Sequence, residues 1–234
     1  MDASHLLGLL ADTLARIDGD MPLAARLCRA CVEILGAEGG ALTVSPSPDE
    51  RLVVSTSDGM SARIEDLQEV LGEGPAQLAL EQDRLVVMPI DGATADAFPV
   101  FAQMVRSIGG PITAYAVPMR VHGTVMGVLS LYTTDARLSR DLVDAQFLAD
   151  AVGTSLLDDT EPIDWSAQAR IHQAAGMVTA QLRIPPADAL AVLRAHAFAR
   201  SSTLQDVVDD VLDHRLDFTH DNTSDDQTER TEEP

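Results

Sequence analysis

Two cysteines spaced as Cys-x-x-Cys are the first candidates for chemistry in this sequence of 234 residues. A redox dithiol of the thioredoxin type has this spacing, and it also follows a strand. Cys28 and Cys31 instead fall within residues 23–35, a segment with helical apolar periodicity that stops at Gly36. We therefore expect two buried helical thiols rather than a redox motif.

The other residues that could bind metals or phosphates are poorly placed for that role. Six histidines are scattered along the chain, and none forms a group with cysteines or carboxylates at metal-ligand spacing. The loop Gly72-Glu-Gly-Pro75 lacks the Gly-Lys-Ser/Thr element of a P-loop. The sequence thus predicts no catalytic residue, no metal site and no cofactor, and a protein that is not an enzyme.

Three short helices are predicted over residues 169–218. Each has one apolar stripe at spacings of three and four residues: Ile171, Ala174, Ala175, Val178 and Leu182; Ala189, Leu190, Leu193 and Ala197; Leu204, Val207, Val208, Val211 and Leu212. Pro185-Pro186 separates the first two helices, because proline fixes φ and lacks an amide donor. Ser201-Ser202 ends the second helix, and Thr203 to Asp206 resembles a capping box that begins the third. These stripes can be buried only against one another, so an all-α three-helix bundle follows.

Gly176 stands in the middle of the first of these helices. A glycine inside a helix costs about 1 kcal/mol relative to alanine and therefore needs a reason. Close packing of alanine-rich helices is one reason, and access for a ligand or a nucleic-acid backbone is the other. Packing is the explanation that physical considerations alone favour.

The segments IHQAAGM, ADALAVLRAHAFAR and LQDVVDDVL occur in that order and without gaps. Together they resemble an ANTAR domain, the RNA-binding output module of bacterial antitermination regulators. The resemblance implies an RNA-binding role for Gln173, Ala174, Gly176, Arg194 and Ala197. Packing would explain the two alanines equally well.

Charge adds further candidates on the same helices. Arg170, Arg183 and Arg200 are assigned to RNA binding on charge grounds alone. His172 and His196 lie on the same helices, within reach of an RNA. The sequence departs from many ANTAR domains in having Ala175 where they carry a basic residue, which should weaken contact with phosphate.

The net charge of −21 opposes binding to a polyanion, but it is unevenly distributed. Residues 1–164 contain 25 acidic residues and 10 arginines, whereas residues 165–218 contain six aspartates and five arginines. The remaining residues, 219–234, carry six acids and one arginine and are expected to be a disordered acidic tail. The predicted bundle is therefore nearly neutral in a strongly acidic protein.

The rest of the chain predicts a different architecture. The expected order is a helix over residues 23–35, two strands, helices, a strand, a helix within residues 94–107, two strands around His122-Gly123, and a helix over residues 137–157. This order gives an α+β fold with a central antiparallel sheet flanked by helices. LGEGPAQLAL, RLVVMP and AVPMRVHGTVMGVLSLYTT resemble parts of a GAF domain over residues 20–157.

The GAF resemblance implies a sensor with a pocket between the sheet and its helices. An unidentified small molecule could fill this pocket, which is empty in some members. Free-methionine sulfoxide reductases use cysteines of the GAF fold, so a thiol enzyme remains an alternative. The expected organisation is an N-terminal helix (1–18), a GAF-like domain (19–157), a hinge (158–164), an ANTAR domain (165–218) and the tail (219–234).

Two further expectations concern location and assembly. No segment approaches the roughly 18 unbroken apolar residues of a membrane span, and no basic residue precedes the first apolar run, so we expect a cytoplasmic protein without a membrane partner. Apolar seams on residues 4–17 and 138–157 predict a homodimer.

The predicted function is that of a GAF–ANTAR transcription antitermination regulator that binds RNA hairpins in nascent transcripts. The alternative is a ligand-binding or protein-binding signalling regulator whose ANTAR bundle has lost its affinity for RNA.

Overall fold

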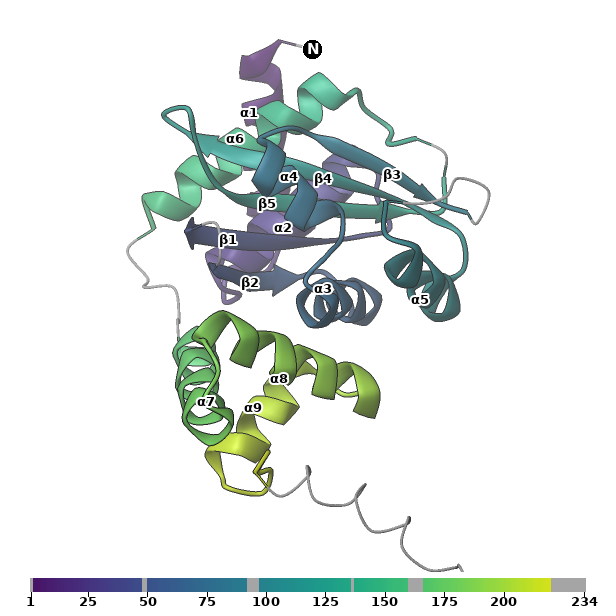
Figure 1. Cartoon of the computed structure of the whole chain (residues 1–234). Coiled ribbons are helices and arrows are strands. Elements are labelled where there is room, and N and C mark those ends of the chain that lie inside the picture. The colour runs from purple at the N-terminus through teal and green to yellow at the C-terminus, as the bar shows by residue number, and fades with distance from the viewer. Residues whose placement is uncertain (1, 48–49, 92–96, 136, 160–165, 220–234) are drawn as a thin grey trace, which may run out of the picture. The chain divides into compact units, whose positions relative to one another are not determined.

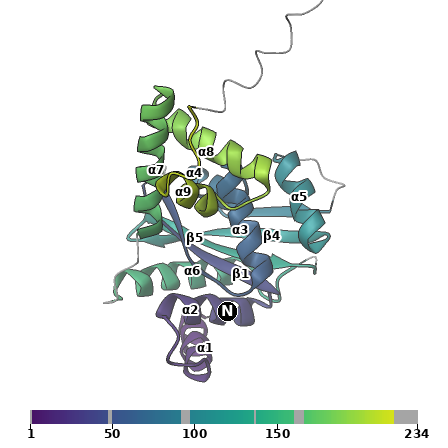
Figure 2. The same ribbon diagram turned by 90° about the horizontal axis from the view of Figure 1, so that it is seen from below.

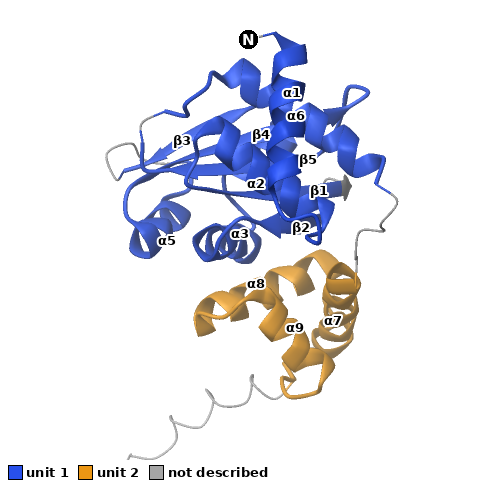
Figure 3. Ribbon diagram, turned by 180° about the vertical axis from the view of Figure 1, so that it is seen from behind, with its two compact units in different colours: residues 1–164 blue, residues 165–234 orange. Residues whose placement is uncertain are grey.

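The computed structural model describes residues 2–47, 50–91, 97–135, 137–159 and 166–219. The chain divides into two compact units, residues 1–164 and residues 165–234 (Figure 3). The predicted hinge at 158–164 and the predicted tail at 219–234 fall almost entirely outside the described residues.

A five-stranded antiparallel sheet forms the centre of the first unit (Figure 1). Its strands lie in the order β2-β1-β5-β4-β3. They are β1 (Gly39–Ser47), β2 (Glu50–Thr56), β3 (Val86–Ile90), β4 (Ile112–Val121) and β5 (Thr124–Thr133). The antiparallel sheet predicted from the sequence is confirmed.

The β4–β5 hairpin is tight because its two connecting residues adopt left-handed conformations. His122 has φ 51° and Gly123 has φ 81°. Two-residue turns with positive φ at both positions match the twist of the strands, and they favour glycine at the second position. The register shifts by one residue between Met119 and Arg120, and beyond this irregularity Ala116 pairs with Ser130 and Ala114 with Tyr132.

Helices cover both faces of the sheet, as Figure 2 shows for α2 and α6 on one side and α3 and α5 on the other. The helices of this unit are α1 (Ala3–Arg16), α2 (Leu23–Leu35), α3 (Gly59–Leu71), α4 (Pro75–Gln82), α5 (Pro99–Gly109) and α6 (Leu142–Leu157). On the α3 side, α4 packs Ala76 and Ala79 against Val86, Ala116 and Val128 of the sheet. This α+β arrangement confirms the predicted fold class of the first unit.

Local hydrogen bonds decide where several helices begin and end. Gly36 ends α2 with φ 67°, as the sequence predicts. The final helix of the unit begins at Leu142 and not at residue 137, because the Asp141 side chain caps it by accepting a hydrogen bond from the Asp144 amide (2.8 Å). The helix predicted at 94–107 begins only at Pro99, and residues 94–96 lie outside the described part.

The second unit contains α7 (Ser166–Leu182), α8 (Pro186–Arg200) and α9 (Leu204–Leu212), and each of these helices packs against the other two. The capping box is confirmed: the Asp206 amide donates to Thr203 Oγ1 (3.1 Å), and the Thr203 amide donates to Asp206 Oδ2 (3.1 Å). Pro186 occupies the first turn of α8, as predicted. Across the described residues of both units, no helix has the length and apolarity needed to cross a membrane.

Candidate functional site

The outer face of α7 carries two of the predicted RNA-binding residues, Gln173 and Gly176. Both are exposed, and they lie one turn apart on the helix. Ala169, Ala180 and Arg183 are also exposed and continue the same row at spacings of three and four residues. We call these five residues the α7 outer row; it lies opposite the buried stripe of the same helix.

Open space surrounds Gly176. A Cβ atom built on this residue would meet no other described atom within 4 Å. The explanation from helix packing is therefore wrong, because nothing described in the bundle requires the missing side chain. The glycine leaves the backbone of α7 accessible at the centre of the outer row.

The predicted alanines lie on the opposite side of their helices. Ala174 and Ala197 have no exposed surface, so their methyl groups pack between helices and their side chains make no surface available to an RNA. Ala175 is only 7% exposed. A cation at this position would have to extend out of the bundle core to reach a phosphate.

Acidic residues of α9 hold two of the predicted arginines. Arg170 Nη2 lies 2.7 Å from Asp209 Oδ1, and Arg200 Nη1 lies 3.3 Å from Asp210 Oδ2. The bond from Arg170 lowers the pKa of Asp209, and the bond from Arg215 lowers that of Asp210. These ion pairs join α9 to both α7 and α8.

The remaining arginines differ in exposure. Arg183 is exposed just beyond the end of α7, where it makes no ion pair with any described residue. Arg194 is half-buried. His172 is exposed, whereas the His196 ring packs edge-on against Phe218 at 5.3 Å between centroids. Of the predicted positions, those on the α7 outer row are exposed and form no ion pair with any described residue, whereas the exposed Arg170 and Arg200 are held by aspartates.

In the first unit, the two cysteines are fully buried in α2, as predicted. Burial raises the pKa of Cys28 to about 12 and raises that of Cys31 as well. A protonated thiol without solvent access is neither a nucleophile nor a redox group. Across the described residues, no cluster of His, Cys, Asp or Glu could hold a metal ion.

A buried polar cluster lies between α3 and the sheet. Tyr132 Oη donates a hydrogen bond to Glu65 Oε1 (2.7 Å), and Gln68 Nε2 donates to Glu65 Oε2 (3.0 Å). Gln68 Oε1 accepts a hydrogen bond from the Ala76 amide at the start of α4 (2.8 Å). These residues, which we call the α3 cluster, connect α3 to β5 and to α4.

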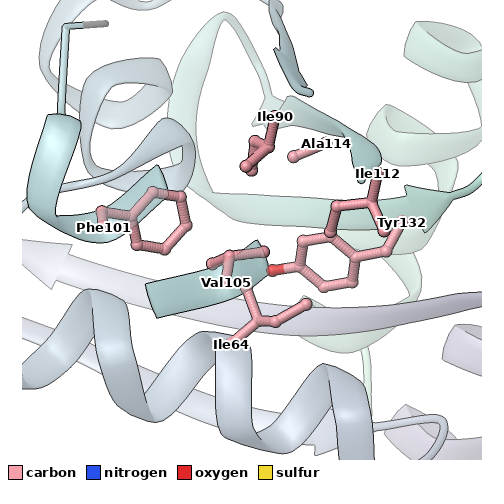
Figure 4. Close-up of a cluster of buried hydrophobic side chains, with 7 residues drawn as sticks. All are labelled: Ile64, Ile90, Phe101, Val105, Ile112, Ala114 and Tyr132. Atoms are coloured by element: carbon pink, nitrogen blue, oxygen red, sulfur yellow. The ribbon is translucent and has the colours of Figure 1, made fainter. Parts of the chain in front are cut away.

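Apolar side chains surround this cluster. Figure 4 shows the Tyr132 ring within a group that also contains Ile64 of α3 and Phe101 and Val105 of α5. Desolvation raises the pKa of the Glu65 carboxyl, although the Tyr132 hydroxyl opposes this shift by hydrogen bonding to the carboxylate. Desolvation and the neighbouring Glu65 raise the pKa of Tyr132.

A comparison of the sequence with family models decides the identity of the first unit. Residues 22–156 match the model of the GAF domain, and this range is more than half of the chain. The chain belongs to the GAF domain family. No protein of curated function matches it.

Several proteins of known structure resemble the chain. They include the A. aeolicus nlh2 GAF domain in an inactive state, with 16% identity, a TM-score of 0.42, and 66% of this chain and 92% of that chain covered. The GAF domain of a phosphoenolpyruvate-protein phosphotransferase from Coxiella burnetii has 14% identity and a TM-score of 0.46, with 67% and 95% covered. The chromophore-binding domain of a Stigmatella aurantiaca bacteriophytochrome (Thr289His mutant) in the Pr state has 11% identity and a TM-score of 0.41, with 68% and 62% covered.

The α3 cluster lies inside the GAF domain, and the apolar pattern of the sequence does not predict it. That pattern indicates only packing for Tyr132 and gives no role to Glu65. One signal was present: Ser61, Glu65 and Gln68 recur at spacings of four and three, and all three are buried. A polar stripe on the buried side of a GAF helix indicates an interior polar site.

Proposed function

We propose that this protein is an RNA-binding regulator of transcription antitermination. In this proposal the GAF domain is the sensor, and the three-helix unit is an ANTAR domain that binds a hairpin in a nascent transcript and so favours continued transcription. A GAF domain supports a signalling role in general, and the RNA-binding role rests on the second unit. The observation that supports the RNA-binding role is that the α7 backbone is accessible at Gly176, beside the exposed side-chain amide of Gln173.

The chemistry of RNA hairpins fits such a surface. Hairpin loops expose unstacked bases, whose edges both donate and accept hydrogen bonds. The Gln173 side chain offers two donors and one acceptor on a single exposed amide. Gly176 has no side chain to hold a base or a phosphate away from the helix. Arg183 supplies a cation at the end of the same row.

The electrostatics permit binding, despite the net charge of −21. Arg170 and Arg200 form ion pairs that are partly exposed, since their side chains retain 44% and 50% of their accessible surface. Exposed ion pairs contribute only about 0–1 kcal/mol, so a phosphate can compete with the aspartates for these arginines. We expect RNA affinity to fall steeply with salt concentration.

The remaining parts of the proposal concern assembly and location. We propose a cytoplasmic homodimer in which the function involves no chemical step and no membrane. Exposed apolar side chains on α1 and α6 supply a surface for the second copy: Leu7 is 47% exposed and Val143 is 77% exposed. Leu6 and Leu10, by contrast, are buried within the unit.

Filling the space at Gly176 tests the RNA-binding role. Gly176→Ala and Gly176→Leu should each raise the melting temperature, because alanine and leucine are about 0.5–1 kcal/mol more favourable in a helix than glycine. Both should lower hairpin affinity, measured by fluorescence anisotropy, and leucine should lower it at least tenfold. Gly8→Ala is the matched control, because Gly8 is likewise exposed within a helix and a Cβ atom added to it would meet nothing within 4 Å.

The second candidate function is a signalling regulator whose bundle has lost RNA affinity. The absence of a cation at buried Ala175, together with the aspartates that hold Arg170 and Arg200, favours it. One measurement distinguishes the two functions, namely the binding of hairpin RNA by the wild-type protein. If the wild-type protein binds no hairpin RNA even at low salt, this second function replaces the first.

A further inference from the structure

The described chain leaves the second unit beside the α7 outer row. The Phe218 side chain is buried in this unit, and its backbone amide donates a hydrogen bond to Gln181 Oε1 (3.3 Å). The described residues end one position later, at Thr219. Gln181 directly follows Ala180 of the outer row and lies two positions before Arg183. The chain beyond Thr219 therefore starts close to the C-terminal end of this row.

The chain beyond Thr219 is strongly acidic. Residues 220–234, which we call the acidic segment, lie outside the described part of the structure. Their sequence, HDNTSDDQTERTEEP, has six acidic residues, one arginine and none of the large apolar residues that form hydrophobic cores. Because such a segment has almost no apolar area to bury, it can bind a protein surface only through charge and hydrogen bonds. A surface that binds it must offer cations and few carboxylates.

Of the three helices in the second unit, α7 offers such a surface. It contains no acidic residue, whereas α9 carries three aspartates. Arg170 lies on α7 and Arg183 just beyond its end. Arg183 is exposed and forms no ion pair with any described residue. The ion pair between Arg170 and Asp209 shows that an arginine of this helix already binds a carboxylate.

We propose that the acidic segment binds back on the α7 outer row, with its carboxylates on Arg183 and in competition for Arg170. The row runs from Ala169 to Arg183, which is about 21 Å of helix. The fifteen residues of the segment can span up to about 50 Å, so they are long enough to cover the whole row. Because the segment belongs to the same chain, its effective concentration at the row is on the order of millimolar.

This inference rests on the proposed function, in which the same row binds RNA. Carboxylates of the segment then occupy the positions that RNA phosphates need. A carboxylate can replace a phosphate at an arginine, but it cannot replace the bases of a hairpin loop, which carry the sequence information. The acidic segment therefore suppresses binding to RNA in general more strongly than binding to a hairpin whose bases contact the row.

A spin label on the acidic segment tests this binding without RNA. Gln227→Cys provides the attachment site, because Cys28 and Cys31 are buried and protonated and will not react with a thiol reagent. We expect the label to weaken the amide NMR signals of Gln173 and Gly176 at low salt. At high salt, where the charges are screened, both signals should recover.

Two variants of the labelled protein are the controls. In the first, the six acidic residues of the segment are replaced by their amides, so the label stays tethered at the same place without the charge. In the second, Arg183→Gln removes the exposed cation of the row. Both variants should recover most of the Gln173 and Gly176 signal at low salt.

Deletion of residues 220–234 tests the effect on RNA. The probe is fluorescein-labelled poly(U), which presents phosphates without a hairpin. We expect the deletion to raise the affinity for poly(U) about three- to tenfold at low salt, and this gain should disappear as the salt concentration increases. The deletion changes the net charge by five, so the control makes the same change in the first unit. It replaces five exposed acidic residues by their amides: Asp2, Asp12, Asp20, Glu81 and Asp135.

The proposal is overturned if the label weakens neither signal on α7, or if it weakens them equally when the segment is neutral. An equal gain in poly(U) affinity in the deletion variant and in the control would also overturn it, because net charge alone would then account for the gain. The spin-label measurement contains no RNA, so a failure of hairpin binding leaves its result unchanged. A protein that binds hairpin RNA without any contact between the segment and α7 would retain the proposed function and lose only this inference.

Discussion

Asp209 on α9 accepts a hydrogen bond from Arg170 on α7 across 2.7 Å. The carboxylate also accepts a hydrogen bond from the Gln205 side chain (2.8 Å), which holds it on the surface of α9. An RNA that contacts Arg170 must therefore displace or share this carboxylate.

Replacing Asp209 should strengthen RNA binding. Asp209→Asn removes a competing anion, and because an exposed ion pair contributes about 0–1 kcal/mol, affinity should rise by up to about fivefold. The slope of log affinity against log salt should steepen by up to about one as Arg170 gains a phosphate. Asp213→Asn is the control with the same charge change, because Asp213 pairs with Arg215 and not with Arg170. Equal gains in RNA affinity in Asp209→Asn and Asp213→Asn would mean that the affinity depends only on the net charge of the protein.

The position of an added cation should decide its effect. Ala175→Lys places a basic residue where many ANTAR domains have one, but Ala175 is 7% exposed, so we expect a lower melting temperature in this variant. Ala180→Lys puts the same charge on the exposed α7 outer row and should raise hairpin affinity without loss of stability. Circular dichroism and anisotropy measure the two effects. A stable Ala175→Lys protein with the larger gain in affinity would contradict this expectation.

Glu65 should make the stability of the GAF domain depend on pH. Its pKa in the folded protein is raised above the ordinary value of 4.5, so the folded state retains a proton that the unfolded state releases. The stabilisation from protonated Glu65 is complete below 4.5 and is lost as the pH rises through the folded pKa. Glu65→Gln cannot release this proton, so its melting temperature should rise relative to that of the wild type over the same interval. Parallel pH profiles for the two proteins would exclude this linkage.

The homodimer should depend on the exposed end of α6. Val143 is 77% exposed, and Val143→Asp would place a charge in the proposed interface. We expect this variant to be monomeric in light scattering at micromolar concentrations, with an unchanged circular dichroism spectrum. Val100→Asp is the control, since Val100 is 45% exposed on α5, which covers the opposite side of the sheet. A wild-type mass that stays monomeric at every concentration would remove the dimer altogether.

Local sequence signals were sufficient for much of the fold. Gly36 ends α2, Pro186 begins α8, and the Thr203–Asp206 box begins α9 because each effect involves residues within one turn of helix. The β4–β5 hairpin was equally predictable, since its turn residues and its apolar strands are adjacent in the sequence. The start of α6 was misplaced, because several polar residues precede it and the choice of Asp141 as the cap was not visible in the apolar pattern.

The site residues were harder to predict because their environments come from distant segments. Glu65 and Tyr132 are 67 positions apart, and Arg170 and Asp209 are 39 positions apart. Periodicity can place a residue on a helix face, but it does not show what another helix brings to that face. For this reason the sequence favours a packing role for Gly176, although in the structure no described atom lies within 4 Å of a Cβ atom built there.

Three chain reversals of the second unit place a non-glycine residue in the left-handed region: Arg183 (φ 57°), Ser201 (φ 53°) and His214 (φ 58°). This conformation costs about 1–2 kcal/mol for each such residue, which is a large share of the stability of a bundle with so many alanines in its core. These three residues therefore make the bundle less stable than glycines at the same reversals would. A molecule that binds only the folded form adds about 2.7 kcal/mol at a concentration of one hundred times its Kd. In the proposed function, a bound RNA would thus also lower the population of unfolded bundle that proteases can cleave.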